Sequence, residues 1–312
     1  MDLQTELDLG NQCYINKNYE QAIIHYDRLL AVHSDNFIIC HNKGLSLIKL
    51  DRLDEAIPYL QLAMNHGYAE SWLAYGSILR TKGSYKEAMT AFANAFLIEN
   101  ENSAAYSNYG NSLREFGKPN ISIPFFQLAM QLNPNDMTAR LNLSVAHLMN
   151  GDFLNGWKYY DARWFYESDV SFKPVLAGIE YDGTQDIKDK IIFVYAEQGL
   201  GDCVQFGRYL TVLQNHGAHI KFFCRKPLER FFRHNYPDIK IYVENESNLQ
   251  GVGYDYHVPL MELPKCFNTT IDNIPPINYS VGDDIINYWY NRLGPTNKKR
   301  IGIVWSSNRN NF

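Results

Sequence analysis

The chain has 312 residues, a formal net charge of −5 and 46% hydrophobic residues, enough for about two domains with full cores. It has neither the clustered basic face of a nucleic-acid-binding protein nor an apolar run of about 18 residues. We therefore expect no nucleic-acid partner and no membrane span.

The cysteines and the N-terminus indicate the compartment. The five cysteines are scattered and form no CxxC pair, which favours reduced thiols over a disulfide framework or a zinc site. The N-terminal stretch MDLQTELDLG lacks the basic and apolar parts of a secretory signal. The sequence predicts a cytoplasmic protein with no metal and no cofactor.

Residues 1–165 contain an internal repeat. Four glycines lie 34, 32 and 34 residues apart, and three further columns keep the same register. A small residue follows each glycine by 12 positions, a bulky one by 16 and a mostly small one by 19. The glycine column consists of Gly10, Gly44, Gly76 and Gly110. The small residues 12 positions later are Ala22, Ala56, Ala88 and Ser122, and the bulky residues 16 positions later are Tyr26, Leu60, Phe92 and Phe126. This pattern predicts one helix pair per repeat, with the small residues inside the pair and the bulky column packed on the next pair.

These columns resemble the tetratricopeptide repeat, whose period is about 34 residues. Trp72 and Pro134 match the aromatic and closing-proline positions of that family. Arrays of this kind present a concave groove, so the resemblance implies a protein or peptide partner held by the repeats.

A fifth, degraded repeat follows. Residues 137–150 read as its first helix, and the stretch from Gly151 reads as an aromatic second helix. Trp157, Tyr160 and Trp164 recur at helical spacing and share a face. They predict a capping helix that closes the array, with a sugar-stacking surface as the alternative.

Residues 166–298 change character. A linker-like stretch precedes strands at 190–196, 219–225, 239–244 and 254–264. Helices are expected from about 200 to 214, at 227–235 and at 283–294, and a last strand at 299–308. Strands separated by helices predict a parallel sheet with ligands beyond the carboxyl ends of its strands.

The first of these strands leads into the loop EQGLGD. Glu197, Gln198, Gly199 and Gly201 shape a turn at a helix start, where free amides favour an anion or a polar oxygen. Asp202 has two interpretations, a first-turn acid that stabilises the helix and a general base. Gln205 and Arg208 follow on the same helix, and Arg208 is expected either to hold a phosphate or to form a salt bridge.

The order of these motifs resembles bacterial tetratricopeptide-repeat glycosyltransferases, which are related to heptosyltransferases and protein O-linked N-acetylglucosamine transferases. EQGLGD…QFGRYL at 197–210 is the most specific element, with YDYHVPLMELP at 254–264 and IGIVWSSN at 301–308. The resemblance implies the GT-B architecture of two Rossmann-like domains and inverting, metal-independent transfer from a nucleotide sugar. It implies that Asp202 is the catalytic base and that Ser306, Ser307 and Asn308 meet the donor phosphates.

We therefore expect an all-α tetratricopeptide solenoid (1–165), an α/β Rossmann-like acceptor domain (166–298) and the start of a donor domain (299–312). The nucleotide-gripping element of that family, a DT…AHLAG-like string, is absent from the 312 residues. A chain of this extent is expected to be inactive by itself. Two alternatives stay open, a non-catalytic protein-binding scaffold and an enzyme completed by a second chain.

Overall fold

The computed structural model describes residues 3–165, 174, 176–244 and 251–295. The chain folds into two compact units. The array unit consists of Met1–Leu176, Asp182–Gln185 and Met261–Ile274, and the sheet unit consists of Ala177–Tyr181, Asp186–Leu260 and Pro275–Phe312.

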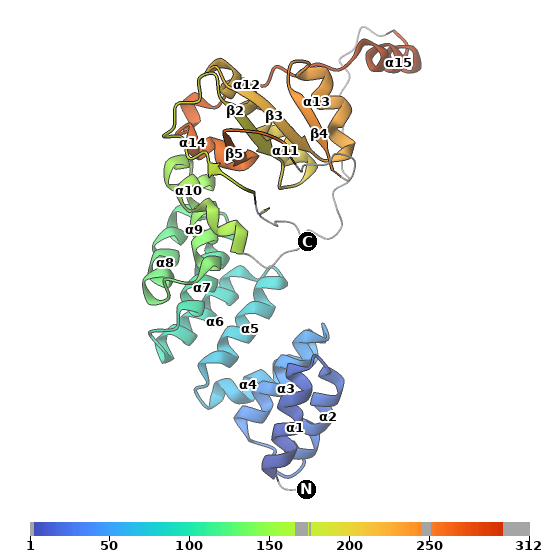
Figure 1. Ribbon diagram of the computed structural model, residues 1–312. Helices are drawn as coiled ribbons and strands as arrows, with labels where there is room; N and C mark the ends of the chain where they lie inside the picture. The colour runs from blue at the N-terminus through green and yellow to red at the C-terminus, as the bar shows by residue number, and fades with distance from the viewer. Residues whose placement is uncertain (1–2, 166–173, 175, 245–250, 296–312) are drawn as a thin grey trace. The chain divides into compact units, whose positions relative to one another are not determined.

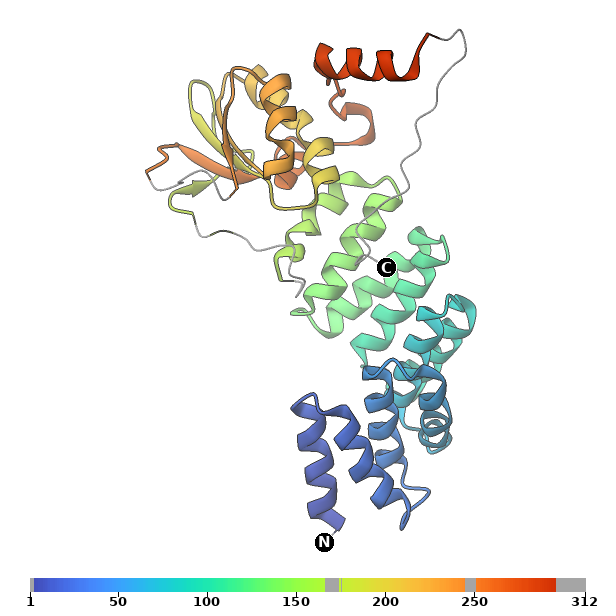
Figure 2. The ribbon, with the colours of Figure 1, turned by 90° about the vertical axis from the view of Figure 1, so that its right-hand side faces the viewer.

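The array unit contains five consecutive antiparallel helix pairs (Figures 1 and 2). The solenoid of helix pairs predicted from the sequence is confirmed. Its helices are α1 (Leu3–Ile15), α2 (Tyr19–Leu30), α3 (Phe37–Lys49), α4 (Leu53–Asn65), α5 (Ala69–Thr81), α6 (Tyr85–Ile98), α7 (Ser103–Glu115), α8 (Pro119–Leu132), α9 (Met137–Met149) and α10 (Phe153–Tyr159), and a 3₁₀ helix, η1 (Tyr160–Phe165), continues from the last.

The repeated glycines lie against the bulky column of their own pair. A Cβ at Gly76 would come within 2.6 Å of Phe92, and one at Gly110 within 2.9 Å of Phe126. Gly10 and Gly44 meet Tyr26 and Leu60 in the same way. The bulky side chains are buried, and three of them also share hydrophobic clusters with the next pair, as Phe126 does with Leu143. They therefore pack on both sides, and the glycines provide the room for their rings.

The turn inside each pair repeats a left-handed backbone that the sequence columns had not revealed. The φ angles are positive at one equivalent position in all five pairs, occupied by Lys17, Asp51, Gly83, Gly117 and Gly151. Glycine adopts this conformation without steric cost, whereas the first two pairs tolerate a strained side chain there.

The fifth pair keeps the close approach of its two helices, but the positions of the glycine and of the other small residue are exchanged between them. Ser144 stands in the glycine column, and Gly156 stands in the column that is Ala or Ser elsewhere. The Ser144 hydroxyl donates to the buried carbonyl of Gly156 at 2.7 Å. A Cβ at Gly156 would lie 2.5 Å from Leu148. Close approach is therefore retained, but the glycine is now on the second helix.

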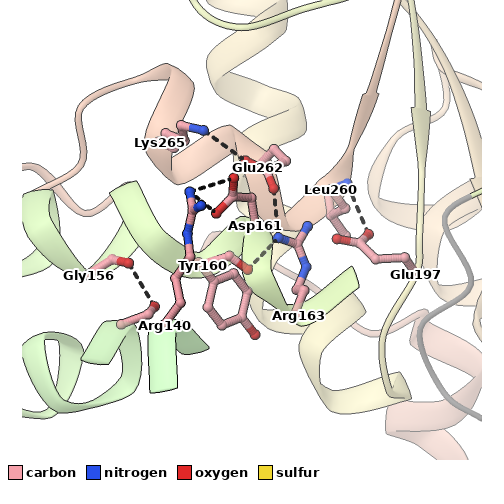
Figure 3. A network of polar contacts seen from close by, with 10 residues as sticks. Arg140, Gly156, Tyr160, Asp161, Arg163, Glu197, Leu260, Glu262 and Lys265 are labelled. Carbon is pink, nitrogen blue, oxygen red and sulfur yellow. Dashed lines mark hydrogen bonds and ion pairs between the residues drawn. The ribbon is translucent and has the colours of Figure 1, made fainter. Parts of the chain in front are cut away.

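The same pair carries Arg163 in a column that holds Leu or Ala in the other four. Arg163 is 3% exposed and donates to Glu262 at 2.6 Å (Figure 3). Its guanidinium also stacks on the rings of Tyr160 and Trp164. Glu262 belongs to the Met261–Ile274 segment of the array unit, which contains α14 (Leu263–Cys266) and η4 (Ile271–Asn273).

This segment takes the place of a sixth helix pair, because α14 contacts α10. Trp157 is buried in the closing pair and packs edge-on against Tyr160. The aromatic residues are thus used in closing the array, which is the burial expected of a capping helix.

The sheet unit contains five parallel strands in the order β1-β5-β2-β3-β4. The strands are β1 (Ile179–Glu180), β2 (Ile191–Tyr195), β3 (His219–Cys224), β4 (Lys240–Val243) and β5 (Tyr256–Pro259). Its helices are α11 (Leu200–Phe206), α12 (Arg208–Asn215), η2 (Lys226–Leu228), α13 (Glu229–Asn235) and α15 (Asp283–Leu293). The predicted parallel sheet is confirmed, and its core consists of buried strand residues such as Phe193 and Phe222.

Three expected elements differ in the structure. The strand expected at 254–264 ends at Pro259, and η3 (Leu260–Glu262) and α14 follow it. The helix expected from about 200 to 214 is divided at Gly207, where a Cβ would lie 2.7 Å from both Phe232 and Tyr279. The linker-like stretch supplies the edge strand β1, and the strand expected at 299–308 lies outside the described residues.

Membrane crossing is not supported by any helix in the described ranges, since none is both long and apolar enough. Burial raises the pKa of the Cys203 and Cys266 thiols to about 12 and that of Cys224 to about 11. These thiols are therefore protonated near neutral pH and are poor nucleophiles.

Candidate functional site

The first helices of the pairs form one layer of the array. Each contacts the first helix of the next pair, so that α1, α3, α5, α7 and α9 follow one another side by side. Residues one, four and five positions after each repeated glycine lie on the same face of these helices. We call this shared surface the inner face.

A cavity of about 330 Å³ opens where α1 and α3 meet on this face. It is lined by Asn11, Tyr14, Ile15, Tyr26, Asn42 and Leu45. We call it the asparagine pocket. Its walls are largely apolar, and two amide side chains supply the polar groups.

The amide of Asn11 is fixed by two hydrogen bonds. Its Oδ1 accepts from the Tyr26 hydroxyl at 2.9 Å and from Asn42 Nδ2 at 3.1 Å. Burial raises the pKa of Tyr26 to about 12, so its phenol remains a donor at neutral pH. This arrangement leaves Asn11 Nδ2 as a donor and Asn42 Oδ1 as an acceptor, neither of which bonds to another described residue.

The inner face becomes polar along α5, α7 and α9. Arg80 donates to Glu115 at 2.8 Å, and Arg114 donates to Asn142 at 3.2 Å. Arg80 Nε and Asn111 Oδ1 are buried without a hydrogen-bond partner among the described residues.

In the sheet unit, the carboxylates of Glu197 and Asp202 both accept hydrogen bonds from backbone N–H groups. Asp202 accepts the Gly199 N–H at 3.1 Å, three positions upstream, which is the contact of a first-turn acid at a helix start. Glu197 is buried, and its Oε2 accepts the Leu260 N–H at 3.1 Å (Figure 3).

The remaining residues of the glycine loop are spread around the start of α11. The Gln198 carbonyl lies 3.8 Å from the Cys203 thiol, and Gly201 and Gln205 are exposed. Arg208 bonds to backbone carbonyls, through Nε to Gln205 at 2.7 Å and through Nη1 to Pro275 at 3.0 Å. The guanidinium therefore anchors the segment that begins at Pro275.

The glycine loop leaves the sheet where its strand order reverses. From β2 the chain moves through β3 to β4 in one direction, and β5 then pairs on the opposite side of β2. The Glu197–Leu260 bond joins the two segments that leave β2 and β5 at this point. In open α/β sheets such a switch point is the usual place for a ligand.

Two other expectations concern the donor loop and metals. Ser306, Ser307 and Asn308 lie outside the described residues. Within the part of the chain that is described, no three His, Cys, Asp or Glu side chains gather in an arrangement that could hold a metal ion.

Residues 41–105, which run from α3 into α7, match the tetratricopeptide repeat family model. This segment therefore resembles tetratricopeptide repeats. This match and the helix pairs agree with the repeat columns of the sequence.

Two curated relatives are similar to this chain at low identity. Protein STIP1 homolog of Dictyostelium discoideum is 28% identical over 167 residues, which are 51% of this chain and 28% of that protein. Protein FlbA of Caulobacter vibrioides is 22% identical over 333 residues, covering 96% of this chain and 54% of that protein. The chain thus spans only about half, or less, of the length of these relatives.

The solved structure of PilF from Pseudomonas aeruginosa is also similar. It is 18% identical with a TM-score of 0.49, over 54% of this chain and 77% of that one. The family match and the two curated relatives give the glycosyltransferase resemblance no support.

The residues of the inner face were not predicted from the sequence. The glycine register contained the signal, because Asn11 and Asn111 both follow a repeated glycine by one position, and Tyr14, Arg80 and Arg114 follow one by four. That Asn42 meets Asn11 depends on the packing of neighbouring pairs, 31 residues apart in the chain.

Proposed function

We propose that this chain is a protein-binding scaffold whose array holds a peptide segment along the inner face. Helical repeat arrays characteristically use extended surfaces of this type to bind partners. The observation that carries the proposal is the asparagine pocket, a cavity of about 330 Å³ between two consecutive repeats.

The chemistry of the pocket suits a peptide backbone beside an apolar side chain. Asn11 Nδ2 offers a donor and Asn42 Oδ1 an acceptor, and a peptide group carries one carbonyl and one N–H. Tyr14, Ile15 and Leu45 provide an apolar wall next to these amides. Because Tyr26 holds Asn11 in place, little side-chain entropy is lost when a ligand binds.

Selection from a phage-displayed library of random peptides on the immobilised chain tests this proposal. We expect enrichment of peptides that bind the wild-type chain and not the Leu45→Arg variant, which places a long cation in the pocket. Leu62→Arg is the matched control, because Leu62 is a 42% exposed leucine on the second helix α4. If nothing is enriched, or if Leu45→Arg retains all binders, the groove does not hold peptides.

We propose as a second candidate that the sheet unit is the acceptor side of a glycosyltransferase. The specific observation in its favour is the position of the glycine loop at the switch point between β2 and β5. In this proposal Asp202 deprotonates the acceptor hydroxyl, and Ser306, Ser307 and Asn308 meet the donor phosphates. The nucleotide sugar is the substrate, and no metal takes part.

Sugar transfer from UDP-N-acetylglucosamine or ADP-heptose, followed as a mass increase of a groove-bound peptide, tests the second candidate. The polypeptide encoded by the complete reading frame is assayed. We expect Asp202→Asn to reduce transfer at least about 100-fold, the usual size of general-base catalysis, and Asp186→Asn to leave it unchanged. Full activity of Asp202→Asn would contradict its role as the base, and the absence of any transfer would remove this candidate.

A further inference from the structure

The inner face changes from apolar to cationic along one column of residues. Four positions after the repeated glycines stand Tyr14, Ile48, Arg80 and Arg114, all half-buried. Equivalent positions of a solenoid lie in a line along its repeats, so this column presents two apolar side chains followed by two guanidinium groups. At its N-terminal end this column borders the asparagine pocket, because Tyr14 is one of the residues that line the pocket.

The cationic end already holds one carboxylate of the chain itself. Glu115 lies 2.8 Å from Arg80 Nη1 and 4.0 Å from Arg114 Nη2. Two guanidinium groups therefore share the carboxylate of Glu115. The side chains of Arg80 and Glu115 are 31% and 28% exposed, which leaves them open to a ligand.

The same cluster contains unused polar atoms. Arg80 Nε is buried and lacks an acceptor among the described residues, and Asn111 Oδ1 lacks a donor there. The Arg80 side chain as a whole is partly exposed, so a ligand carboxylate would accept from the exposed N–H groups of its guanidinium. Guanidinium groups favour carboxylates because their N–H groups match the two carboxylate oxygens.

We propose that the inner face selects an extended peptide segment with an apolar residue in the asparagine pocket and an acidic residue at Arg80 and Arg114. This inference rests on the proposed peptide-binding function and adds to it the chemistry of the partner. The acidic side chain competes with Glu115 for the two guanidinium groups, while the apolar residue is held beside Asn11 and Asn42.

The repeat geometry sets the distance between the two ligand residues. The pocket lies between the first and second pairs, and the cationic cluster lies between the third and fourth, two repeats further along. Helices in contact have axes about 8–10 Å apart, so the two subsites are separated by about 20 Å. Since an extended chain rises about 3.3 Å per residue, the apolar and acidic residues are expected about six positions apart.

The test continues the phage selection with individual peptides made from the enriched sequences. We expect an apolar residue and an Asp or Glu about five to seven positions apart in these peptides. Replacing that acid by its amide in the peptide is expected to weaken binding to the wild-type chain about ten-fold, measured by fluorescence polarisation. The same replacement in the peptide should change its affinity for the Arg80→Gln/Arg114→Gln variant only slightly.

Two further variants separate charge from fold. Arg80→Lys/Arg114→Lys keeps both charges and should retain most of the preference for the acid. Arg52→Gln removes an exposed arginine that pairs with Glu55 near the start of α4 and should behave as wild type. The inference would be overturned, with peptide binding still standing, by either of two results. One is that the enriched peptides carry no acid at this spacing; the other is that replacing the acid by its amide weakens binding equally to the wild-type chain and to the Arg80→Gln/Arg114→Gln variant. Failure to enrich any peptide would instead remove the proposed function.

Discussion

The four regular helix pairs and the closing pair reach the same packing with different residues. In the regular pairs a glycine on the first helix admits a bulky residue of the second, as Gly76 does for Phe92. In the closing pair the glycine is on the second helix, and Arg163 replaces the Leu or Ala of the other pairs. The difference follows from the neighbour of each pair, because a regular pair packs on another helix pair and the closing pair packs on the Met261–Ile274 segment.

The largest expected effect concerns Arg163 in the closing pair. Arg163→Met leaves Glu262 buried without its principal cation and should lower the free energy of unfolding by about 3–5 kcal/mol. Urea unfolding followed by circular dichroism at the helix band measures this. The double variant Arg163→Met/Glu262→Leu removes both charges and should recover most of the loss. A single variant as stable as wild type would show that the ion pair does not hold the closing segment.

Low pH should destabilise the regular helix pairs through His41, whose side chain is buried and hydrogen-bonded to Ser71 at 2.8 Å. Burial lowers the pKa of His41 to about 4 from 6.5, so the unfolded chain binds more protons between these values. Stability contributed by neutral His41 is therefore present above pH 6.5 and is lost as the pH falls toward 4, by up to about 3 kcal/mol. In thermal unfolding from pH 7.5 to 4.5, His41→Gln should show a smaller loss than wild type. Parallel pH profiles would contradict this assignment.

The smallest of the three effects tests the exchange of small residues. Gly76→Ser puts the closing pair's residue into a regular pair, where its Cβ would lie 2.6 Å from Phe92. Overpacking of this type should cost about 1–3 kcal/mol in the free energy of unfolding, and adding Phe92→Leu should relieve part of it. The matched change Ser144→Ala loses only the hydrogen bond to Gly156, at about 1 kcal/mol. A Gly76→Ser variant as stable as wild type would show that the glycine does not provide the room for the Phe92 ring.

The candidate sites differ in how far the sequence could reveal them. The glycine loop is contiguous in the chain, so its residues could be named before the fold was known. The asparagine pocket brings together side chains of three helices, and Asn11 and Asn42 meet only because consecutive pairs stack. A local pattern could not show that contact, since it depends on the superhelical packing of the repeats.

The sequence by itself determined the repeat register, the helix pairs, the closing aromatic helix and the parallel strands of the second half. These features depend on residue spacing along a single helix, strand or repeat period, which the chain carries locally. Only the tertiary structure decided that β5 pairs beside β2, that a helix breaks at Gly207 and that Arg163 meets Glu262. Those outcomes depend on contacts between residues far apart in the chain, up to 99 positions for Arg163 and Glu262, and no local pattern specifies them.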